Sequence, residues 1–407
     1  MMEKGFLNIT SEIGNLKAVL LHRPGKELER LTPGYLEELL FDDIPWLKRM
    51  QEEHDDFAKV MKARGSKIYY YETLLADVLR DEHIKNQFVV DVIKNSHVGN
   101  IELEKIIIEY LQGERPESIV EIAISGLHKE DFPKMEREFH LVDYVKYDYP
   151  FYINPLPNLY FTRDPGAVIG QGLSVNKMKT PARDRETMFL SYIYRHHPLF
   201  KEKGTSLWYD YQEHYPMEGG DILVLSDEVV ALGCSERTTA RGIEILAQRL
   251  FAKGKVKKVL VIQIPFTRAY MHLDTVFTMV DHDKFTIYPG VENAVRVYEL
   301  TQGVTTPKVT PKESLEKALM EVLHLPAVQL IQSGGGDEIT AAREQWNDST
   351  NTLAIAPGTV ITYNRNEATN DTLRKHGIEV IEIEGSELVR GRGGPRCMSM
   401  PLLREEL

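Results

Sequence analysis

Short apolar runs alternate with an amphipathic helical pattern in the middle of the chain. Residues 222–225 and 229–233 are two such runs, each with the length and aliphatic content of a buried strand. Between about 238 and 252 the apolar positions fall three or four residues apart, which predicts a helix, and the aliphatic run at 258–262 predicts a third strand. This segment is therefore expected to fold as two strands, a helix and a strand. The apolar positions of its helix are Ile243, Leu246 and Leu250.

The same order of elements recurs from about residue 155 to residue 385, and each copy begins at an acidic or glycine-rich turn. The starts lie 54 to 63 residues apart, which is enough for a small sheet and a helix in each copy. Repeats of this kind stack radially in architectures such as propellers. The turns that begin the four copies are Arg163-Asp164-Pro165, Glu218-Gly219-Gly220-Asp221, His272-Leu273-Asp274 and Gly334-Gly335-Gly336-Asp337.

A fifth copy is predicted to be divided between the two ends of the chain. Residues 1–72 contain a strand, a helix and a second strand, and residues 386–407 are expected to supply the missing hairpin and close a ring. Residues 73–150 do not fit the repeat. Their apolar residues have helical spacing, so we expect a mainly helical insertion there. The predicted fold is α/β, a pseudo-symmetric ring of five units like a propeller, with residues 151–385 forming the other four units.

Composition and charge narrow the class of protein. The 407 residues are 42% hydrophobic, which is enough for a large core. The net charge of −12 should repel nucleic acid and anionic membranes, so no such partner is expected. No apolar run has the length of a membrane span, and the first residues lack the apolar core of a signal peptide. The chain is therefore expected to be a soluble cytoplasmic protein, and a homo-oligomer stays open.

The residues with reactive side chains occupy similar places in successive units, near the start of each hairpin. Equivalent positions in a ring face the same end of its axis, so these side chains are expected to meet in one pocket. Asp337 follows three glycines and is equally well explained as a turn residue. The residues in this set are Asp164, Glu218, His272, Asp274, Asp337 and Cys397.

Cys397 is one of two cysteines, and it lies in a turn that is rich in glycine and arginine. Glycine lets the backbone approach a ligand closely, and the flanking Arg392 and Arg396 are expected to favour the thiolate, which is the nucleophilic form. The other cysteine, Cys234, follows an apolar run and is predicted to be structural. Two cysteines exclude a disulfide framework and a cysteine-rich zinc site.

His272 and Asp274 form a candidate metal half-site, because an extended strand would place both side chains on one face. No second cluster offers further ligands at convincing spacing, and the pair His196-His197 is explained as solvated residues at a helix end. The sequence therefore predicts neither a metal nor another cofactor.

Six motifs, in order along the chain, resemble those of the bacterial arginine deiminases of the guanidino-group-modifying, or pentein, superfamily. The resemblance covers essentially the whole length, and it implies a five-bladed α/β propeller with a helical insertion. The acidic pair Asp42-Asp43 belongs to one motif, but no chemical role can be derived for it. The motifs are Leu21-His22-Arg23-Pro24-Gly25, Phe41-Asp42-Asp43-Ile44-Pro45, Pro157-Asn158-Leu159-Tyr160-Phe161-Thr162-Arg163-Asp164, Glu218-Gly219-Gly220-Asp221, Met271-His272-Leu273-Asp274 and Arg396-Cys397-Met398.

The resemblance implies hydrolysis of free L-arginine to L-citrulline and ammonia, as a step of arginine catabolism. By similarity, Asp164 and Asp274 grip the guanidinium while Cys397 attacks its carbon and forms a covalent thiouronium. His272 would protonate the departing nitrogen and then activate water, and Glu218 would orient His272.

The resemblance also implies contacts to the other end of the substrate. Arg183 and Arg237 match carboxylate-binding positions, for which the forked guanidinium is well suited. Asn158 and the backbone of Phe161 match positions that hold the polar end of the substrate. Arg392 is similar to a residue that shifts on binding, and Gly391 and Gly393 are expected to act as its hinge. The residues with implied substrate contacts are Asn158, Phe161, Arg183, Arg237, Gly391 and Arg392.

Two alternatives remain at this stage. A related amidinotransferase or dimethylarginine hydrolase would use much the same cysteine, histidine and carboxylates. A non-catalytic binding protein of the pentein fold would not need them. The intact set of Cys397, His272 and Glu218 favours an enzyme, and the long helical insertion favours a deiminase.

Overall fold

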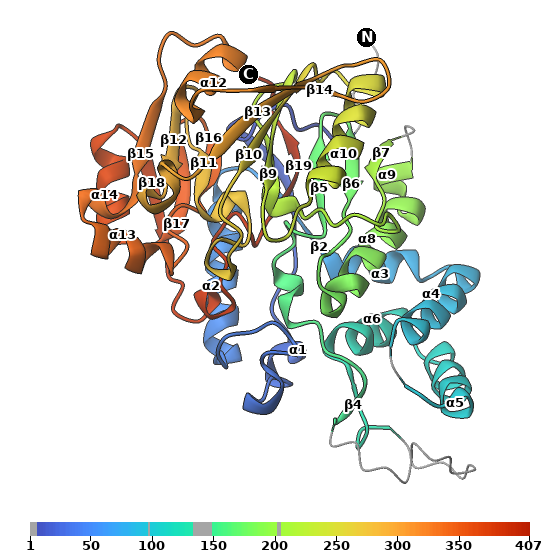
Figure 1. Ribbon diagram of the computed structural model, residues 1–407. Helices are drawn as coiled ribbons and strands as arrows, with labels where there is room; N and C mark the ends of the chain where they lie inside the picture. The colour runs from blue at the N-terminus through green and yellow to red at the C-terminus, as the bar shows by residue number, and fades with distance from the viewer. Residues whose placement is uncertain (1–5, 97, 133–148, 202–204) are drawn as a thin grey trace.

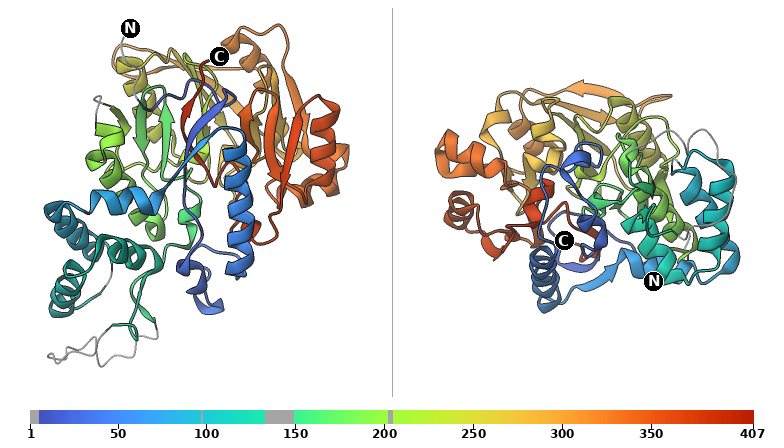
Figure 2. Two further views of the ribbon diagram at one scale, coloured as in Figure 1. Left: turned by 180° about the vertical axis from the view of Figure 1, so that it is seen from behind. Right: turned by 90° about the horizontal axis from the view of Figure 1, so that it is seen from below.

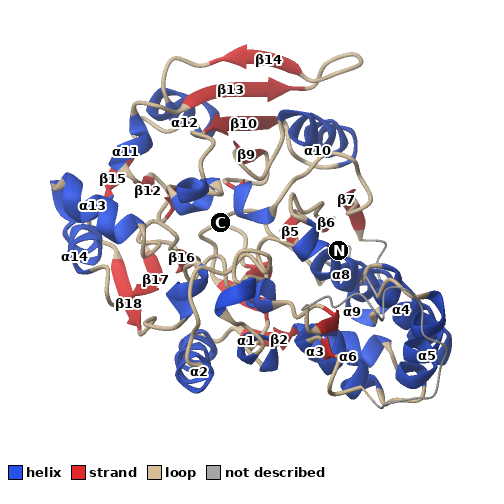
Figure 3. Cartoon of the chain, turned by 60° about the horizontal axis from the view of Figure 1, so that its bottom comes forward, coloured by secondary structure: helices blue, strands red, loops and turns tan. Residues whose placement is uncertain are grey.

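A computed structural model describes residues 6–96, 98–132, 149–201 and 205–407. The fold is mixed α/β. Strand pairing among the described residues forms six separate sheets rather than one closed sheet. Five of these sheets lie around the middle of the molecule, and a group of helices projects to one side (Figures 1 and 3).

The unit predicted around residue 222 is present with nearly the expected boundaries. Its first two strands pair antiparallel, the chain passes through a helix, and the third strand returns parallel to the second. The helix begins where the Thr239 hydroxyl accepts a hydrogen bond from the backbone N–H of Gly242, which caps the first turn. The elements are β8 (Ile222–Val224), β9 (Val229–Cys234), α10 (Ala240–Lys253) and β10 (Lys258–Gln263).

Three further units repeat this plan of an antiparallel pair followed by a parallel return. The recurring units are thus present with the predicted strand order, and the predicted spacing holds for all but the last of them. Their elements are β5 (Gly166–Ile169), β6 (Gly172–Val175), α8 (Asp184–His196) and β7 (Ser206–Tyr209); β11 (Phe277–Met279), β12 (Lys284–Ile287), α12 (Leu315–Leu323) and β15 (Gln329–Gln332); and β16 (Leu353–Ala356), β17 (Thr359–Tyr363), α14 (Glu367–Lys375) and β18 (Glu379–Ile383).

Strands from the two ends of the chain pair in one sheet. β19 (Met400–Arg404) pairs antiparallel with β1 (Leu16–Leu21), and β2 (Lys67–Tyr70) returns parallel to β1. The connection between β1 and β2 contains α2 (Leu47–Ala63), whose apolar face is buried. The C-terminal segment before β19 is thereby brought into the middle of the molecule (Figure 3).

Two features depart from the predicted repeat. Gly334 to Asp337 do not begin the last hairpin, because α13 (Glu338–Gln345) follows them and β16 starts only at Leu353. Asp337 is exposed, and its carboxylate caps α13 by accepting the N–H of Thr340. The second departure is an added hairpin, β13 (Arg296–Thr301) and β14 (Lys308–Pro311), which extends the sheet of β8 to five strands.

The described segment after β2 is mainly helical up to Ser125, and residues 133–148 of the predicted helical insertion lie outside the described residues. Four helices lie away from the five sheets, on one side of the molecule (Figure 2). Pro116 at the first position of the last of them suits a helix start, since proline lacks the N–H that would be unpaired there. A short two-stranded sheet follows. The elements are α3 (Tyr71–Val78), α4 (Glu82–Lys94), α5 (Ile101–Gln112), α6 (Pro116–Ser125), β3 (Leu127–His128) and β4 (Phe151–Ile153).

The buried apolar residues form three clusters. One joins the helical segment to the sheets of β5 and β9, the second lies under the sheets of β9 to β15, and the third packs α2 against β1 and the C-terminal segment. Full burial of one such side chain contributes about 1.5–3 kcal/mol. The clusters therefore fix the strands, and the strands hold the short turns at their ends in place. The remaining α-helices of the described residues are α1 (Lys26–Glu29), α9 (Pro198–Lys201) and α11 (Pro289–Glu292).

Candidate active site

Five side chains that the sequence singled out meet at one site, although they are far apart in the chain. Asp164 comes just before β5, and Glu218 precedes η4 (Gly219–Asp221), the turn that leads into β8. His272 precedes η6 (Leu273–Thr275), which leads into β11, and Cys397 lies just before β19. All are buried, as is the fifth, Asp274 within η6. The set thus comes from four units of the fold.

The segment of His272 and Asp274 is a 3-10 turn, not the strand that the sequence analysis expected. The N–H of Thr275 donates to the carbonyl of His272, and that of Val276 donates to Leu273. In this turn the side chains of His272 and Asp274 are both buried, although the backbone is not extended as in a strand.

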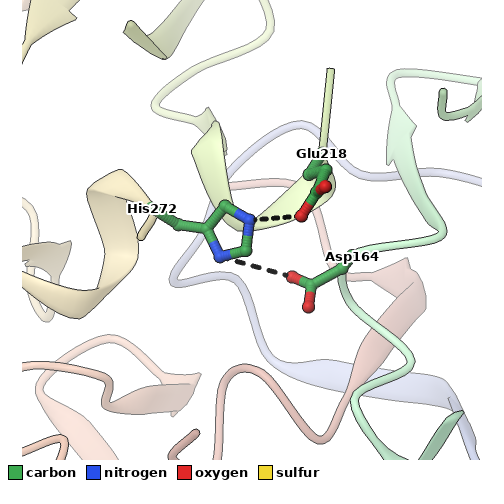
Figure 4. A group of neighbouring side chains, drawn as sticks. All are labelled: Asp164, Glu218 and His272. Carbon is green, nitrogen blue, oxygen red and sulfur yellow. Dashed lines mark hydrogen bonds and ion pairs between the residues drawn. The ribbon is translucent and has the colours of Figure 1, made fainter. Parts of the chain in front are cut away.

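His272 is held between two carboxylates (Figure 4). Its Nε2 lies 2.7 Å from Oε2 of Glu218, and its Nδ1 lies 3.7 Å from Oδ1 of Asp164. Burial disfavours the imidazolium, but Asp164 and Glu218 outweigh it and raise the pKa of His272 to about 9. The imidazole is therefore a protonated acid at neutral pH. Nδ1, the nitrogen that Glu218 does not engage, is free to exchange a proton.

Glu218 is a fixed anion in this arrangement. Burial alone would raise its pKa, but Arg237 and the bond from His272 lower it to about 2. Its second oxygen accepts the N–H of Lys179 at 2.9 Å. Close packing requires glycine at position 220, because a Cβ there would lie 2.6 Å from the ring of His272. Only glycine lets the backbone lie this close to the imidazole.

Asp164 and Asp274 each use one oxygen in a hydrogen bond and leave the other without one. Oδ2 of Asp164 accepts from Nη1 of Arg183 at 2.7 Å, and Oδ2 of Asp274 accepts from Nη1 of Arg396 at 2.7 Å. Oδ1 of both carboxylates is buried and accepts no hydrogen bond, and that of Asp164 faces Nδ1 of His272 at 3.7 Å. A buried unpaired carboxylate oxygen is costly, so the pair is suited to a ligand with several N–H donors.

Cys397 lies beside these carboxylates, with Sγ 3.8 Å from Oδ2 of Asp274. Its backbone N–H donates to Oδ1 of Asn351 at 2.9 Å. Burial raises the pKa of the thiol well above its usual value, and the charges of Asp274, Asp164 and Asp348 raise it further. The expectation that flanking arginines favour the thiolate is therefore wrong for this state of the site. Arg396 is turned toward carboxylates instead, with Nε 3.1 Å from Oε2 of Glu12.

The cavity at the site is small, about 30 Å³. That volume holds on the order of two waters, far less than a bound amino acid needs. All the residues with implied substrate contacts line it, together with Cys397, His272 and Asp164; they are Asn158, Phe161, Arg183, Arg237, Gly391 and Arg392.

The two arginines expected to bind a carboxylate differ in how they are held. Arg183 is fully engaged, with Nη1 on Asp164 and with Nε and Nη2 on Glu186 at 3.0 and 2.8 Å. Arg237 lies more loosely, with Nη1 3.7 Å from Glu218 and Nη2 3.2 Å from the sulfur of Met271. Asn158 donates from Nδ2 to the carbonyl of Leu39. Arg237 therefore has more hydrogen-bonding capacity left than Arg183.

The loop before Cys397 packs on aromatic rings. A Cβ on Gly391 would lie 2.1 Å from the hydroxyl of Tyr160, and one on Gly393 would lie 2.2 Å from the ring of Phe161. Neither glycine has a positive φ, so close packing rather than a left-handed backbone requires them. Arg392 between them does adopt φ +63. The predicted hinge role of the glycines stays a prediction.

Several residues of the site were missed by sequence reasoning. Asp348 is buried with φ +56 and an unpaired Oδ2, and burial raises its pKa to about 7 while the charge of Arg392 opposes that rise. Asn351 joins the N–H of Cys397 to the carbonyl of Asp274, to which its Nδ2 donates at 3.1 Å. These residues occupy the place in the fourth repeat that the sequence analysis gave to Asp337, which lies elsewhere on the surface.

The acidic pair Asp42-Asp43 forms ion pairs across the loops near the site. Asp42 pairs with Arg268, and Asp43 pairs with Arg390. The neighbouring Leu40 lines the cavity. The pair thus joins the loop after residue 35 to two other segments.

The geometry of Asp164, Glu218 and His272 would bring three ligand atoms within 4.8 Å of one another, as a metal requires. The two carboxylates are already engaged, because Arg183 pairs with Asp164 and Arg237 supplies positive charge to Glu218. These side chains are better suited to bind an organic cation than a metal ion.

Cys234 ends β9 and is half-buried. Burial raises the pKa of its thiol. Within the described part of the chain, the helices are too short or too polar to cross a membrane.

The fold is similar to that of solved structures of low sequence identity. An amidinotransferase from Microseira wollei matches with a TM-score of 0.57 and 12% identity, over 99% of this chain and 98% of that one. Unliganded AgrE matches with a TM-score of 0.54 and 15% identity over 96% of this chain, which spans 40% of the length of AgrE. The chain therefore falls in a class of mixed α/β proteins that includes amidinotransferases.

Sequence comparison identifies the family within that class. A family model for arginine deiminase matches residues 37–404. The arginine deiminase of Bacillus cytotoxicus is 50% identical over 407 residues, which cover 98% of this chain and 99% of that protein. This chain belongs to the arginine deiminase family, which confirms the resemblance noted in its motifs.

Proposed function

We propose that the chain hydrolyses the guanidinium of free L-arginine through a covalent adduct on Cys397. Its membership of the arginine deiminase family makes it an enzyme that converts arginine and water to citrulline and ammonia. The observation that carries the proposed chemistry is the pair of unpaired, buried oxygens on Asp164 and Asp274, beside the sulfur of Cys397.

Substrate recognition follows from these two oxygens. A guanidinium is planar and has only N–H donors, and two carboxylates can accept bonds from it at the same time. Such bonds fix the plane of the group and thereby its central carbon relative to a nucleophile. Arg183 and Arg396 occupy the second oxygen of Asp164 and Asp274, so each carboxylate presents its free oxygen in a fixed orientation.

Substrate binding would also activate the nucleophile. In the structure, burial and three carboxylates raise the pKa of Cys397, so the thiol predominates. A guanidinium between Asp164 and Asp274 would neutralise two of those charges and so lower the pKa of the thiol. Cys397 would then lose its proton to water and become reactive only when arginine is bound.

The bond-making steps need one acid-base group. The thiolate adds to the guanidinium carbon and forms a C–S bond, and Nδ1 of His272 gives its proton to the departing nitrogen, which leaves as ammonia. The product is a thiouronium on Cys397. His272, now neutral, takes a proton from water as its oxygen adds to the same carbon. The C–S bond then breaks, the hydroxyl proton passes to solvent, citrulline leaves, and the thiolate of Cys397 is restored. Glu218 stabilises the imidazolium from 2.7 Å before ammonia leaves and again after water has added.

The other end of the substrate is proposed to contact the remaining residues that line the cavity. Arg237 is the preferred partner of the α-carboxylate, because its donors are less occupied than those of Arg183. Asn158, the backbone of Phe161, Gly391 and Arg392 would complete the contacts, and Arg183 would assist from its fixed position.

We also propose a division of the chain into five blades and an inserted helical segment. We take residues 1–72 with 386–407 as one blade, residues 151–385 as four more, and residues 73–150 as a helical insertion, in a five-bladed α/β propeller. The shared strand order of the five sheets supports this description. Two unpaired thiols suit a reducing compartment, which supports a cytoplasmic location. We also propose that the chain can form a homo-oligomer.

The test is to incubate the purified protein with L-arginine, without added metal or cofactor, and to quantify both products. Equal amounts of citrulline and ammonia are expected. Transfer of the amidino group to an added amine, without release of ammonia, would contradict hydrolysis and favour an amidinotransferase. Dimethylarginine offered in place of arginine should give no dimethylamine. Release of dimethylamine would favour the dimethylarginine hydrolase alternative.

A further inference from the structure

Asp221, the last residue of the motif that begins at Glu218, is buried near the site but takes no part in the proposed chemistry. Its Oδ1 accepts a hydrogen bond at 2.7 Å from the backbone N–H of Leu273, the residue after His272. Its Oδ2 accepts a hydrogen bond from the hydroxyl of Ser235, also at 2.7 Å. The carboxylate therefore joins the turn of His272 to the turn that follows β9.

The hydroxyl of Ser235 also holds the turn from which Arg237 projects. Its oxygen accepts hydrogen bonds from the backbone N–H groups of Arg237 at 3.0 Å and of Thr238 at 3.2 Å. Because the hydroxyl also donates to Asp221, its one donor and both of its acceptor positions are in use. Ser235 is buried, so loss of the hydroxyl would leave two N–H groups and one carboxylate oxygen without this partner.

A third hydrogen bond links the same turn to the residue that orients His272. The hydroxyl of Thr238 accepts the backbone N–H of Glu218 at 3.1 Å. The space around Asp221 is tight as well, because a Cβ on Gly233 would lie 2.1 Å from its Oδ1. Hydrogen bonds between buried groups thus tie the turn of Arg237 to both members of the acid-base pair.

The separation of these turns matters because a substrate has two ends. In the proposed function the guanidinium lies beside His272 and Cys397, and Arg237 binds the α-carboxylate. L-homoarginine has the same two ends and one more methylene group between them. A site that holds both ends at a fixed separation therefore discriminates between the two amino acids, and one methylene group is worth about 10–200-fold in such a site.

We propose that Ser235 is a positioning residue that, together with Asp221, sets the separation between Arg237 and the reacting groups. The pair would thereby select a substrate with the length of arginine. This inference rests on the proposed hydrolysis of arginine, because it concerns how the same site measures its substrate.

The expected effect of Ser235→Ala is on binding and on selectivity. A hydrogen bond to a charged group is worth about tenfold or more in an equilibrium, so KM for arginine should rise about tenfold. The value of kcat should stay within about threefold of the parent value, because the variant loses binding rather than a contact to the reacting atoms. Homoarginine should lose less, since a carboxylate site that is placed less precisely tolerates the longer chain. The preference for arginine over homoarginine should therefore fall about fivefold or more.

The test compares kcat/KM for L-arginine and L-homoarginine, followed by release of ammonia, in the parent enzyme and in four variants. Ser235→Ala should lower the ratio of the two values, whereas Ser235→Thr keeps the hydroxyl and should keep the ratio. Asp221→Asn removes the charged acceptor with almost no change of shape and should also lower the ratio. Ser66→Ala is the matched control, because Ser66 is equally buried and its hydroxyl donates to the carbonyl of Leu16 in another sheet.

The outcomes separate a positioning role from a merely structural one. An equal loss for both substrates in Ser235→Ala, or no turnover of homoarginine by parent and variant alike, would overturn the proposal. If Ser235→Ala does not fold, as judged by circular dichroism, Asp221→Asn decides, and an unchanged ratio there would overturn the proposal. A parent enzyme that releases no ammonia from arginine would contradict the proposed function itself.

Discussion

Glu218→Gln changes a single charge next to the proposed acid-base group, and its effect on the pH dependence can be worked out. The carboxylate of Glu218 lies 2.7 Å from Nε2 of His272 and contributes to the rise in the pKa of His272 to about 9. Glutamine keeps the hydrogen bond but not the charge. A hydrogen bond to a charged group is stronger than a neutral one by about 1–2 kcal/mol, so the pKa of His272 should fall to roughly 7.5–8.3.

The assay is the rate of citrulline formation at low arginine concentration between about pH 5 and 10, because kcat/KM reports the free enzyme. His272 must be protonated to release ammonia, so kcat/KM is lost as pH rises through its pKa. The alkaline limb should therefore move to lower pH in Glu218→Gln. Glu344→Gln is the control, since Glu344 is also buried but binds the backbone of α14 instead. An alkaline limb that stays in place would refute the role given to Glu218.

Three further predictions concern binding, packing and stability. Arg237→Ala should raise KM for arginine about tenfold or more through loss of a charged hydrogen bond, and an unchanged KM would contradict its assigned role. Gly220→Ala should displace the ring of His272 and reduce kcat severely, while circular dichroism shows a folded protein; full activity would mean that the close contact is not needed. Glu53 accepts four hydrogen bonds from residues 386–388, so Glu53→Ala should lower the free energy of unfolding in urea by about 3 kcal/mol. A loss below about 1 kcal/mol would show that these bonds contribute little.

Much of the architecture was predictable because each unit contains its own strands and helix. The unit from β8 to β10 was correct to within a few residues, since its aliphatic runs are short and its helix is amphipathic. The start of the last unit was misplaced because three glycines and an aspartate resemble a turn before a hairpin. They are the turn before α13 instead. The hairpin of β13 and β14 was not predicted, because its outer strand is exposed and lacks a buried face.

Only part of the candidate site could be predicted, because only some of its residues occupy equivalent positions in the repeat. Asp164, Glu218 and His272 occupy equivalent positions in their units, so the repeat itself brings them together. Asn351 contacts the backbone of Cys397 and of Asp274, and no periodicity in the sequence encodes such contacts. The charge state of Cys397 was also beyond sequence reasoning, because the nearest charges in space are carboxylates from other units rather than the neighbouring arginines.

Mass spectrometry of Cys397 during turnover tests the central claim most directly. The protein is mixed with L-arginine, quenched in acid within the steady state, digested and analysed for the peptide that contains Cys397. The account predicts an increase in mass equal to arginine less ammonia on this cysteine, absent from Cys234. Cys397→Ser should show neither the adduct nor citrulline formation. Substantial turnover by Cys397→Ser would contradict covalent catalysis by this residue.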